Sequence, residues 1–142
     1  MSKSVLCEEK DNICLITLNE EDTRNAISPE IIKELVNILE EIDNNKNISC
    51  AILTGAGKSF SSGGNLHEIN EMTENNNMSL RDIENWYRNG IQRIPMTFNK
   101  IDVPVIAAVN GHAIGAGNDL CTMCDIRICL LYTSPSPRDV SS

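Results

Sequence analysis

Residues 103–127 read VPVIAAVNGHAIGAGNDLCTMCDIR, the pattern of a strand, a glycine turn and a helix that begins on small residues. The segment 104–109 is continuously apolar, which is typical of a strand covered on both faces. Asn110-Gly111 marks a turn, and Gly115-Ala116-Gly117 opens the helix. Free backbone N–H groups point outward at a helix start, and the helix dipole there favours negative charge. Because the residues are small, the stretch predicts a place where an anionic ligand atom can reach the backbone.

One carboxylate belongs to the same helical turn. Asp119 follows Ala116 by three residues. The two residues therefore lie on one face of the helix, and side chains lean back toward the helix start. This spacing would place an N–H donor and a carboxylate over the same ligand atom. The alternative is that Asp119 is only a first-turn acid, which is a common structural feature of helices.

The N-terminal part has the pattern of an α/β protein. Two strands are expected at 5–9 and 13–18 around a polar turn, and a third at 50–53. Between them, Ser28 as N-cap and Pro29 in the first turn begin a helix with a recurring apolar stripe. The order strand, strand, helix, strand therefore suggests an α/β architecture.

A second glycine-rich turn follows the third strand, at residues 58–67 (KSFSSGGNLH). The Asn-rich segment 70–78 is expected to be a mobile surface loop or a short helix. Ser79 is expected to cap a long helix that runs to about residue 99, with Pro95 kinking or ending it.

Composition argues against several classes of function. The chain has 142 residues, one domain at most, with 41% hydrophobic residues and a net charge of −8. Nucleic-acid and anionic-membrane surfaces need basic clusters, which this charge balance does not favour. No segment approaches the ~18 consecutive apolar residues of a membrane-spanning helix. The N-terminus MSKSVLCEEKD lacks the apolar region of a signal peptide, so we expect a cytoplasmic protein.

The six cysteines are irregularly spaced and mostly lie in apolar runs, so we expect reduced thiols in the core. Cys121 and Cys124 have the CxxC spacing of redox and zinc motifs. A second ligand pair or a thioredoxin context is missing from the sequence, and we therefore expect core thiols and no metal site.

The C-terminal residues 129–142 read CLLYTSPSPRDVSS, in which the segment 134–137 breaks any regular element. Residues 129–139 also resemble one reading frame of a widely used sequencing-library transposon adapter. We expect residues 1–128 to be the N-terminal part of a domain and residues 129–142 to be a non-native tail. A native disordered tail is the alternative.

Five short motifs occur between about residues 5 and 128, and each alone is weak because a glycine-rich turn after a strand is common. Together, in this order and at this spacing, they resemble the enoyl-CoA hydratase/isomerase (crotonase) superfamily. The resemblance implies an α/β fold, a crotonase-like spiral of ββα turns, here truncated, that binds acyl-CoA thioesters. The motifs are Asn25-Ala26-Ile27-Ser28, 60–66 (FSSGGNL), 104–111 (PVIAAVNG), 114–120 (IGAGNDL) and 123–127 (MCDIR).

The resemblance also implies a site. Backbone N–H groups of Gly64 and Ala116 would hold the thioester oxygen as it gains enolate charge, and Asp119 would act as acid/base. No metal or redox cofactor is implied, since coenzyme A is part of the substrate. The implied substrate-binding positions are Ser62, Gly63, Gly64, Asn65, Leu66 and His67 in the first glycine turn, and Gly115 and Ala116 in the second.

Several roles stay open at this point. Typical hydratases carry Glu where this chain has Asp119, whereas the isomerase branch that shifts conjugated dienes carries Asp. Hydratases also use a second carboxylate, and the family spacing places it at Asp139, inside the suspected tail. We expect hydration of a 2-enoyl-CoA of the fatty-acid beta-oxidation type, with double-bond isomerisation through Asp119 as the alternative. A non-catalytic acyl-CoA-binding homologue or an inactive fragment is the third possibility. The resemblance implies homotrimers or hexamers.

Overall fold

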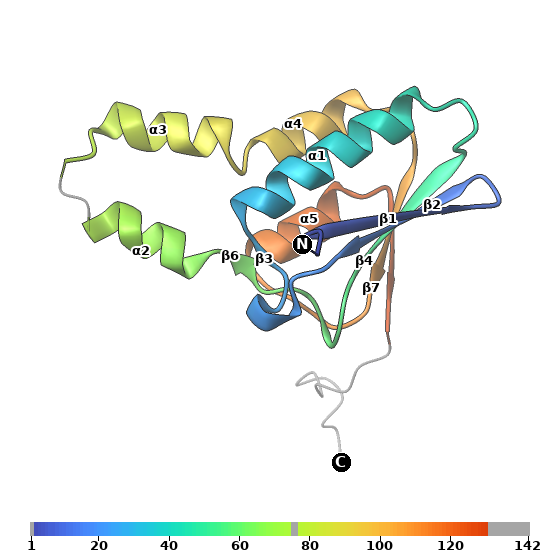
Figure 1. Ribbon diagram of the computed structural model, residues 1–142, viewed down its shortest axis with the longest axis horizontal. Helices are drawn as coiled ribbons and strands as arrows, with labels where there is room; N and C mark the ends of the chain where they lie inside the picture. The colour runs from blue at the N-terminus through green and yellow to red at the C-terminus, as the bar shows by residue number, and fades with distance from the viewer. Residues whose placement is uncertain (1, 75–76, 131–142) are drawn as a thin grey trace, which may run out of the picture.

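Figure 1 shows a computed structural model of the chain, which describes residues 2–74 and 77–130. One five-stranded sheet forms the body, and helices pack on one of its faces. In chain order the elements are β1 (Val5–Lys10), β2 (Ile13–Leu18), the 3-10 helix η1 (Glu21–Thr23), β3 (Ala26–Ile27), α1 (Pro29–Asn44), β4 (Cys50–Gly55), β5 (Ser59–Ser61), β6 (Gly63–Gly64), α2 (Leu66–Glu74), α3 (Leu80–Asn89), α4 (Arg93–Lys100), β7 (Val105–Val109), β8 (His112–Ala113), α5 (Ala116–Met123) and β9 (Ile126–Cys129).

The five-stranded sheet has the order β1-β2-β4-β7-β9. β1 and β2 form an antiparallel hairpin, and every other neighbouring pair is parallel. Parallel neighbours need a crossover connection, which the helical segments between β2, β4, β7 and β9 provide. The expected α/β class is therefore confirmed.

Helix α1 is built by local signals and by one apolar stripe. The Ser28 hydroxyl accepts a hydrogen bond from the Ile31 N–H group at 3.1 Å and donates one to the Glu20 carboxylate at 2.9 Å. Ile31, Leu35 and Leu39 recur every four residues and are completely buried against the sheet. A side chain of this size stabilises the fold by roughly 1.5–3 kcal/mol when it is buried. The helix expected from Ser28 onward is thus confirmed.

The helices cover only one face of the main sheet among the described residues. Leu15, Ile52, Ile106 and Ile126 form one cross-strand row on the other face. Leu15 and Ile126 are exposed there, and Ile52 and Ile106 are half-buried. The expectation of a β7 strand covered on both faces is therefore wrong for the part of the chain that the structure describes.

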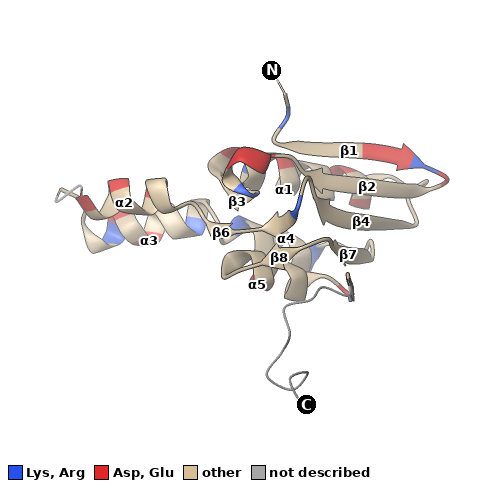
Figure 2. Ribbon diagram, turned by 90° about the horizontal axis from the view of Figure 1, so that it is seen from below, with Lys and Arg blue, Asp and Glu red and all other residues tan. Residues whose placement is uncertain are grey.

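Helices α2 and α3 project from the body as a two-helix arm, which is visible in both views (Figures 1 and 2). Neither helix has a fully buried residue. Figure 2 also shows acidic residues gathered at the end of β1 and in η1. Of the two alternatives for residues 70–78, the short helix is the one found; it begins earlier, at Leu66, and residues 75–76 lie outside the described part.

The single long helix expected after Ser79 is wrong, because the chain forms α3 and α4 with a break at Gly90. A Cβ atom at Gly90 would lie 2.7 Å from the Trp86 carbonyl oxygen, so this close approach requires glycine. Pro95 does not end a helix. It lies in the first turn of α4, where a missing N–H group costs no intrahelical hydrogen bond.

The six cysteines differ in burial. Cys14, Cys121 and Cys124 are buried free thiols, and burial raises the pKa of Cys124 to about 12. The expectation of a core position is therefore confirmed for these three. It is wrong for Cys7 and Cys129, which are exposed on the two edge strands β1 and β9, and Cys50 is half-buried.

The C-terminal tail expected at 129–142 lies almost wholly outside the described residues. Its first residue, Cys129, belongs to β9 and pairs with Val109 of β7. Within the described segments, no helix combines the length and the apolar character that crossing a membrane would require.

Candidate active site

Two small parallel sheets bring the two glycine turns together. β3 pairs with β6, which aligns Ile27 with Gly64, and β5 pairs with β8. β6 thereby packs directly against the start of α5. A Cβ atom at Gly63 would lie 2.5 Å from the Ile114 carbonyl oxygen and 3.4 Å from the Ala116 nitrogen. The two segments named as oxyanion donors, far apart in sequence, are therefore neighbours in the fold.

The start of α5 presents an open N–H group. The Ala116 N–H group has no backbone acceptor among the described residues, as expected for the first residue of a helix. The preceding Gly115 has φ of 53°, and a Cβ atom there would meet nothing within 4 Å. Ala116 can thus donate to a ligand that approaches from the side of Gly115.

Gly117 holds α5 close to the other turn. A Cβ atom at Gly117 would lie 2.5 Å from the Ser61 carbonyl oxygen, so only glycine permits this approach. The Ser61 hydroxyl donates to the Asn25 carbonyl at 2.7 Å and accepts from the Gly63 N–H group at 3.2 Å. Ser61 therefore fixes Gly63 against β3 on one side and α5 on the other.

Two asparagine side chains, which sequence reasoning treated only as parts of motifs, hold these loops in place. Asn25 is fully buried; its amide donates to the Ala56 and Ser59 carbonyls at 3.0 Å, and its oxygen accepts from the Glu20 N–H group. Asn110 donates to the Gly55 carbonyl at 2.8 Å and accepts from the Gly55 N–H group. Their positions next to turns are the only sequence signal of this role.

Asp119 lies in the first turn of α5, on the helix that Ala116 begins. Its side chain is exposed and lines a small pocket of about 170 Å³ together with Ala116. Among the described residues that line this pocket, Asp119 is the only acid. The other lining residues are mostly apolar: Ile27, Ile91, Gln92, Ile94, Pro95, Leu120 and Met123.

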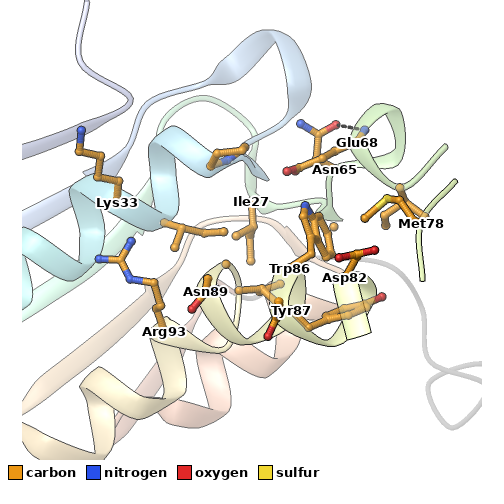
Figure 3. A pocket seen from close by; sticks show the side chains of 17 residues that line it. Ile27, Lys33, Asn65, Glu68, Met78, Asp82, Trp86, Tyr87, Asn89 and Arg93 are labelled. Atoms are coloured by element: carbon orange, nitrogen blue, oxygen red, sulfur yellow. Dashed lines mark hydrogen bonds between the residues drawn. The ribbon is translucent and has the colours of Figure 1, made fainter. Parts of the chain in front are cut away.

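A larger pocket of about 550 Å³ opens between α1, β6 and the α2/α3 arm (Figure 3). Gly64 lines this pocket, while Ala116 and Asp119 line the smaller one. Ile27 and Ile91 line both, so the two pockets adjoin. Met78, Trp86 and Tyr87 are residues that the sequence offered as candidate tunnel lining, with core packing as the favoured interpretation of the Trp86 face. The members that the sequence did not single out come from α1, the arm and the start of α4: Pro29, Ile32, Lys33, Glu68, Ile69, Asp82, Asn85, Asn89, Gly90 and Arg93.

The arm carries one perturbed carboxyl group. Glu68 of α2 and Trp86 of α3 reach toward one another across the larger pocket (Figure 3). Burial raises the pKa of Glu68, Trp86 lowers it by hydrogen bonding to the carboxylate, and the nearby charges of Glu30 and Glu71 raise it further. Burial thus outweighs the hydrogen bond from Trp86, and the net shift of the Glu68 pKa is upward.

The remaining expected substrate-binding residues lie around these pockets with different exposures. Asn65 lines the larger pocket, and its side chain accepts from the His67 N–H group at 3.2 Å. Leu66 is 72% exposed and His67 is exposed. The Ser62 hydroxyl is directed to the Thr23 carbonyl at 2.9 Å. Gly64 and Asn65 are thus the members of this turn that line a pocket.

No group of three or more His, Cys, Asp or Glu side chains that could hold a metal ion occurs among residues 2–74 and 77–130. The smaller pocket offers the Ala116 N–H group and the exposed Asp119 carboxylate, and Gly64 lines the adjoining larger pocket together with Glu68 and Asp82. Such a set can stabilise a developing oxyanion and transfer a proton next to it.

Comparisons with known proteins identify the family of the chain. The sequence profile of the family described as "Enoyl-CoA hydratase/isomerase" matches residues 8–132. A short-chain-enoyl-CoA hydratase from Clostridium acetobutylicum is 35% identical over 126 residues, covering 88% of this chain and 46% of that protein. A mitochondrial Delta(3,5)-Delta(2,4)-dienoyl-CoA isomerase from Pongo abelii is 35% identical over 118 residues, covering 80% of this chain and 36% of that protein.

A solved structure shares the fold. The crystal structure of an enoyl-CoA hydratase from Bacillus anthracis superposes with a TM-score of 0.74 at 32% identity. The match covers 89% of this chain and 47% of the other. The chain therefore spans about half the length, or less, of the proteins that it matches.

Proposed function

This chain belongs to the enoyl-CoA hydratase/isomerase family, and from that premise we propose that the protein acts on acyl-CoA thioesters through an enolate held by Gly64 and Ala116. The observation that carries the proposal is the contact between the two glycine turns, in which Gly63 leaves room for the Ala116 N–H group. Each N–H group donates to the thioester oxygen and binds it more strongly as negative charge develops. One such donor contributes about 3–4 kcal/mol to the stability of a transition state.

Asp119 is the proposed acid/base. It is the only acid among the described residues of the pocket that Ala116 lines, and both residues belong to the first turn of α5. An ionised carboxylate beside a stabilised enolate can remove a proton alpha or gamma to the thioester carbonyl and return it elsewhere. The thioester itself acidifies the alpha position, so no metal or redox cofactor takes part in this proposal.

Hydration of a 2-enoyl-CoA is the first proposed reaction. Water adds at the beta carbon, the thioester oxygen carries the resulting enolate charge, and the alpha carbon then receives a proton. Asp119 would transfer one of these two protons, either by accepting it from the water or by donating it to the alpha carbon. The name of the Clostridium acetobutylicum relative, a short-chain-enoyl-CoA hydratase, supports hydration as the reaction.

Double-bond isomerisation is the second proposed reaction. One observation favours it: the acid in the smaller pocket is Asp119, and the family resemblance implies Asp at this position in the isomerase branch and Glu in typical hydratases. The name of the Pongo abelii relative supports this alternative.

The test uses the protein expressed from its native gene. Hydration of a 2-enoyl-CoA and isomerisation of a dienoyl-CoA are measured with the wild type and with Asp119→Asn, which keeps the shape of the side chain but removes its basicity. We expect the variant to lose roughly 10²–10⁴-fold in kcat for the physiological reaction. The activity of the wild type shows which of the two reactions is the physiological one.

Asp102→Asn is the matched control, because Asp102 is exposed and lines neither pocket. The control is expected to keep wild-type activity. Equal turnover by Asp119→Asn and the wild type would contradict the acid/base role and would favour a non-catalytic acyl-CoA-binding protein.

A further inference from the structure

The larger pocket has a cationic end. Lys33 of α1 and Arg93 at the start of α4 both line it. In Figure 3 they lie on one side, away from Glu68 and Asp82, which come from the arm. The pocket is therefore polarised, with cations toward the body of the protein and carboxylates toward the projecting helices.

Neither cation has a protein partner in the described part of the chain. The ion pair found there joins Arg88 to Glu84 and does not involve the pocket. This is unexpected on electrostatic grounds, because the chain has 20 acidic and only 12 basic residues. Arg93 is moreover half-buried, and a guanidinium group that loses water without gaining an acceptor costs free energy. Its donors are thus available to an anion that enters the pocket.

The pocket that Gly64 and Arg93 both line also has apolar walls. Ile27, Ile32 and Ile91 line the same pocket, and Figure 3 shows Ile27 between the cationic and the acidic ends. Such walls suit a methylene chain, whose burial is favourable by about 0.8 kcal/mol for each CH₂ group. A planar guanidinium group at the far end fits a carboxylate in a bidentate arrangement.

We propose that the larger pocket selects acyl-CoA thioesters whose acyl group ends in a carboxylate, and that Arg93 binds that carboxylate. The inference rests on the proposed function, because it takes the thioester to be held at Gly64. Lys33 is exposed, so its ammonium group attracts the anion but contributes less to the bound state. Glu68 and Asp82 at the opposite end disfavour the reversed orientation.

The test measures binding of saturated acyl-CoAs, which need no turnover. Each pair has equal chain length, with one member ending in a methyl group and the other in a carboxylate: hexanoyl-CoA with adipoyl-CoA, and octanoyl-CoA with suberoyl-CoA. Titration calorimetry on the protein from its native gene is expected to show that the carboxylate member of one pair binds on the order of tenfold tighter or more.

Arg93→Gln is expected to lower the affinity for the carboxylate-ended acyl-CoA on the order of 10- to 100-fold. The affinity for the methyl-ended acyl-CoA should change by less than about twofold. Arg88→Gln is the matched control, because it removes the same charge from a residue of α3 that does not line the pocket. It should change neither of the two affinities. If Arg93→Gln does not fold, Arg93→Lys replaces it. Lysine keeps the charge but loses the bidentate fork, so it should weaken only the carboxylate member.

The phosphates of coenzyme A are the other source of anionic oxygens for Arg93, and pantetheine thioesters of the same acyl groups lack the adenosine phosphates. If Arg93→Gln weakens only the carboxylate-ended pantetheine thioester, the proposal is supported. If the substitution weakens the binding of both CoA ligands equally and leaves the binding of both pantetheine thioesters unchanged, Arg93 binds a phosphate and the proposal is overturned.

Binding and turnover separate this inference from the proposed function. An active enzyme that binds both members of each pair equally would overturn the inference alone. A protein that turns over no enoyl-CoA or dienoyl-CoA, yet binds carboxylate-ended ligands through Arg93, would keep the inference and overturn the proposed activity.

Discussion

Gly63 and Gly64 are adjacent glycines whose surroundings differ sharply. Gly63 has φ of 95° and lies against the Ile114 carbonyl, where a Cβ atom would come within 2.5 Å of the oxygen. At Gly64 the nearest atom to a Cβ would be the Cδ1 atom of Ile69, at 3.3 Å, which is the movable end of a side chain. Two identical residues therefore have separate duties: Gly63 permits the close packing of β6 on α5, and Gly64 faces the larger pocket.

This difference gives a prediction at the scale of the residue. Gly63→Ala is expected to lower the free energy of unfolding by on the order of 3 kcal/mol, because it combines an unfavourable φ with a clash against backbone. Gly64→Ala, the same change one position later, should lower the free energy of unfolding by less than about 1 kcal/mol. Chemical denaturation of the two variants measures both values, and equal losses would contradict the packing described for β6 and α5.

At the scale of the element, the arm helix α3 depends on local signals. It has no fully buried residue, so tertiary packing contributes little to it. Its start carries a complete capping box, in which the Ser79 hydroxyl accepts from the Asp82 N–H group at 3.2 Å and the Asp82 carboxylate accepts from the Ser79 N–H group at 2.8 Å. Hydrogen bonding from Ser79 lowers the pKa of the Asp82 carboxyl group.

Ser79→Ala is therefore expected to cost about 1 kcal/mol in the local stability of α3. Amide hydrogen exchange along residues 80–89 measures this loss, which should appear as faster exchange in α3 with little change in α1. Ser49→Ala is the control, because Ser49 is exposed before β4 and caps no helix. Unchanged exchange in α3 would show that contacts with the body, rather than the cap, hold the helix.

At the scale of the whole molecule, the main sheet presents an apolar face that no described element covers. Ile126 and Ile128 of β9 are 55% and 63% exposed, and Leu15 of β2 is 36% exposed. β9 is also an edge strand, whose free N–H and C=O groups can pair with another chain. Exposed apolar faces of this kind promote association.

The 142-residue chain expressed by itself is accordingly expected to self-associate or aggregate. Ile126→Lys combined with Ile128→Lys should shift it toward the monomer, because two charges on the edge strand disfavour pairing. Sedimentation velocity over a range of concentrations measures the change. A monodisperse wild-type chain that melts cooperatively would contradict the expectation.

Sequence patterns were enough for the elements that local chemistry specifies. The cap at Ser28, the apolar stripe of α1 and the polar turn after β1 each predicted the element that the structure contains. The sequence pattern did not predict the helix break at Gly90, because that break depends on how closely the Trp86 carbonyl approaches the Gly90 backbone. The sequence predicted the break or kink at Pro95 instead, because proline has a stronger intrinsic tendency to break a helix than glycine.

The sequence by itself determined which residues could form a site: two glycine turns, a helix that starts on small residues, and one acid in its first turn. These features are local, because each depends on a few neighbouring residues and their backbone preferences. Only the tertiary structure decided that Gly63 lies against the Ala116 nitrogen, and that Lys33 and Arg93 line the pocket that Gly64 also lines. Such contacts join segments far apart in the chain, and their geometry follows from strand pairing and helix packing that no short stretch encodes.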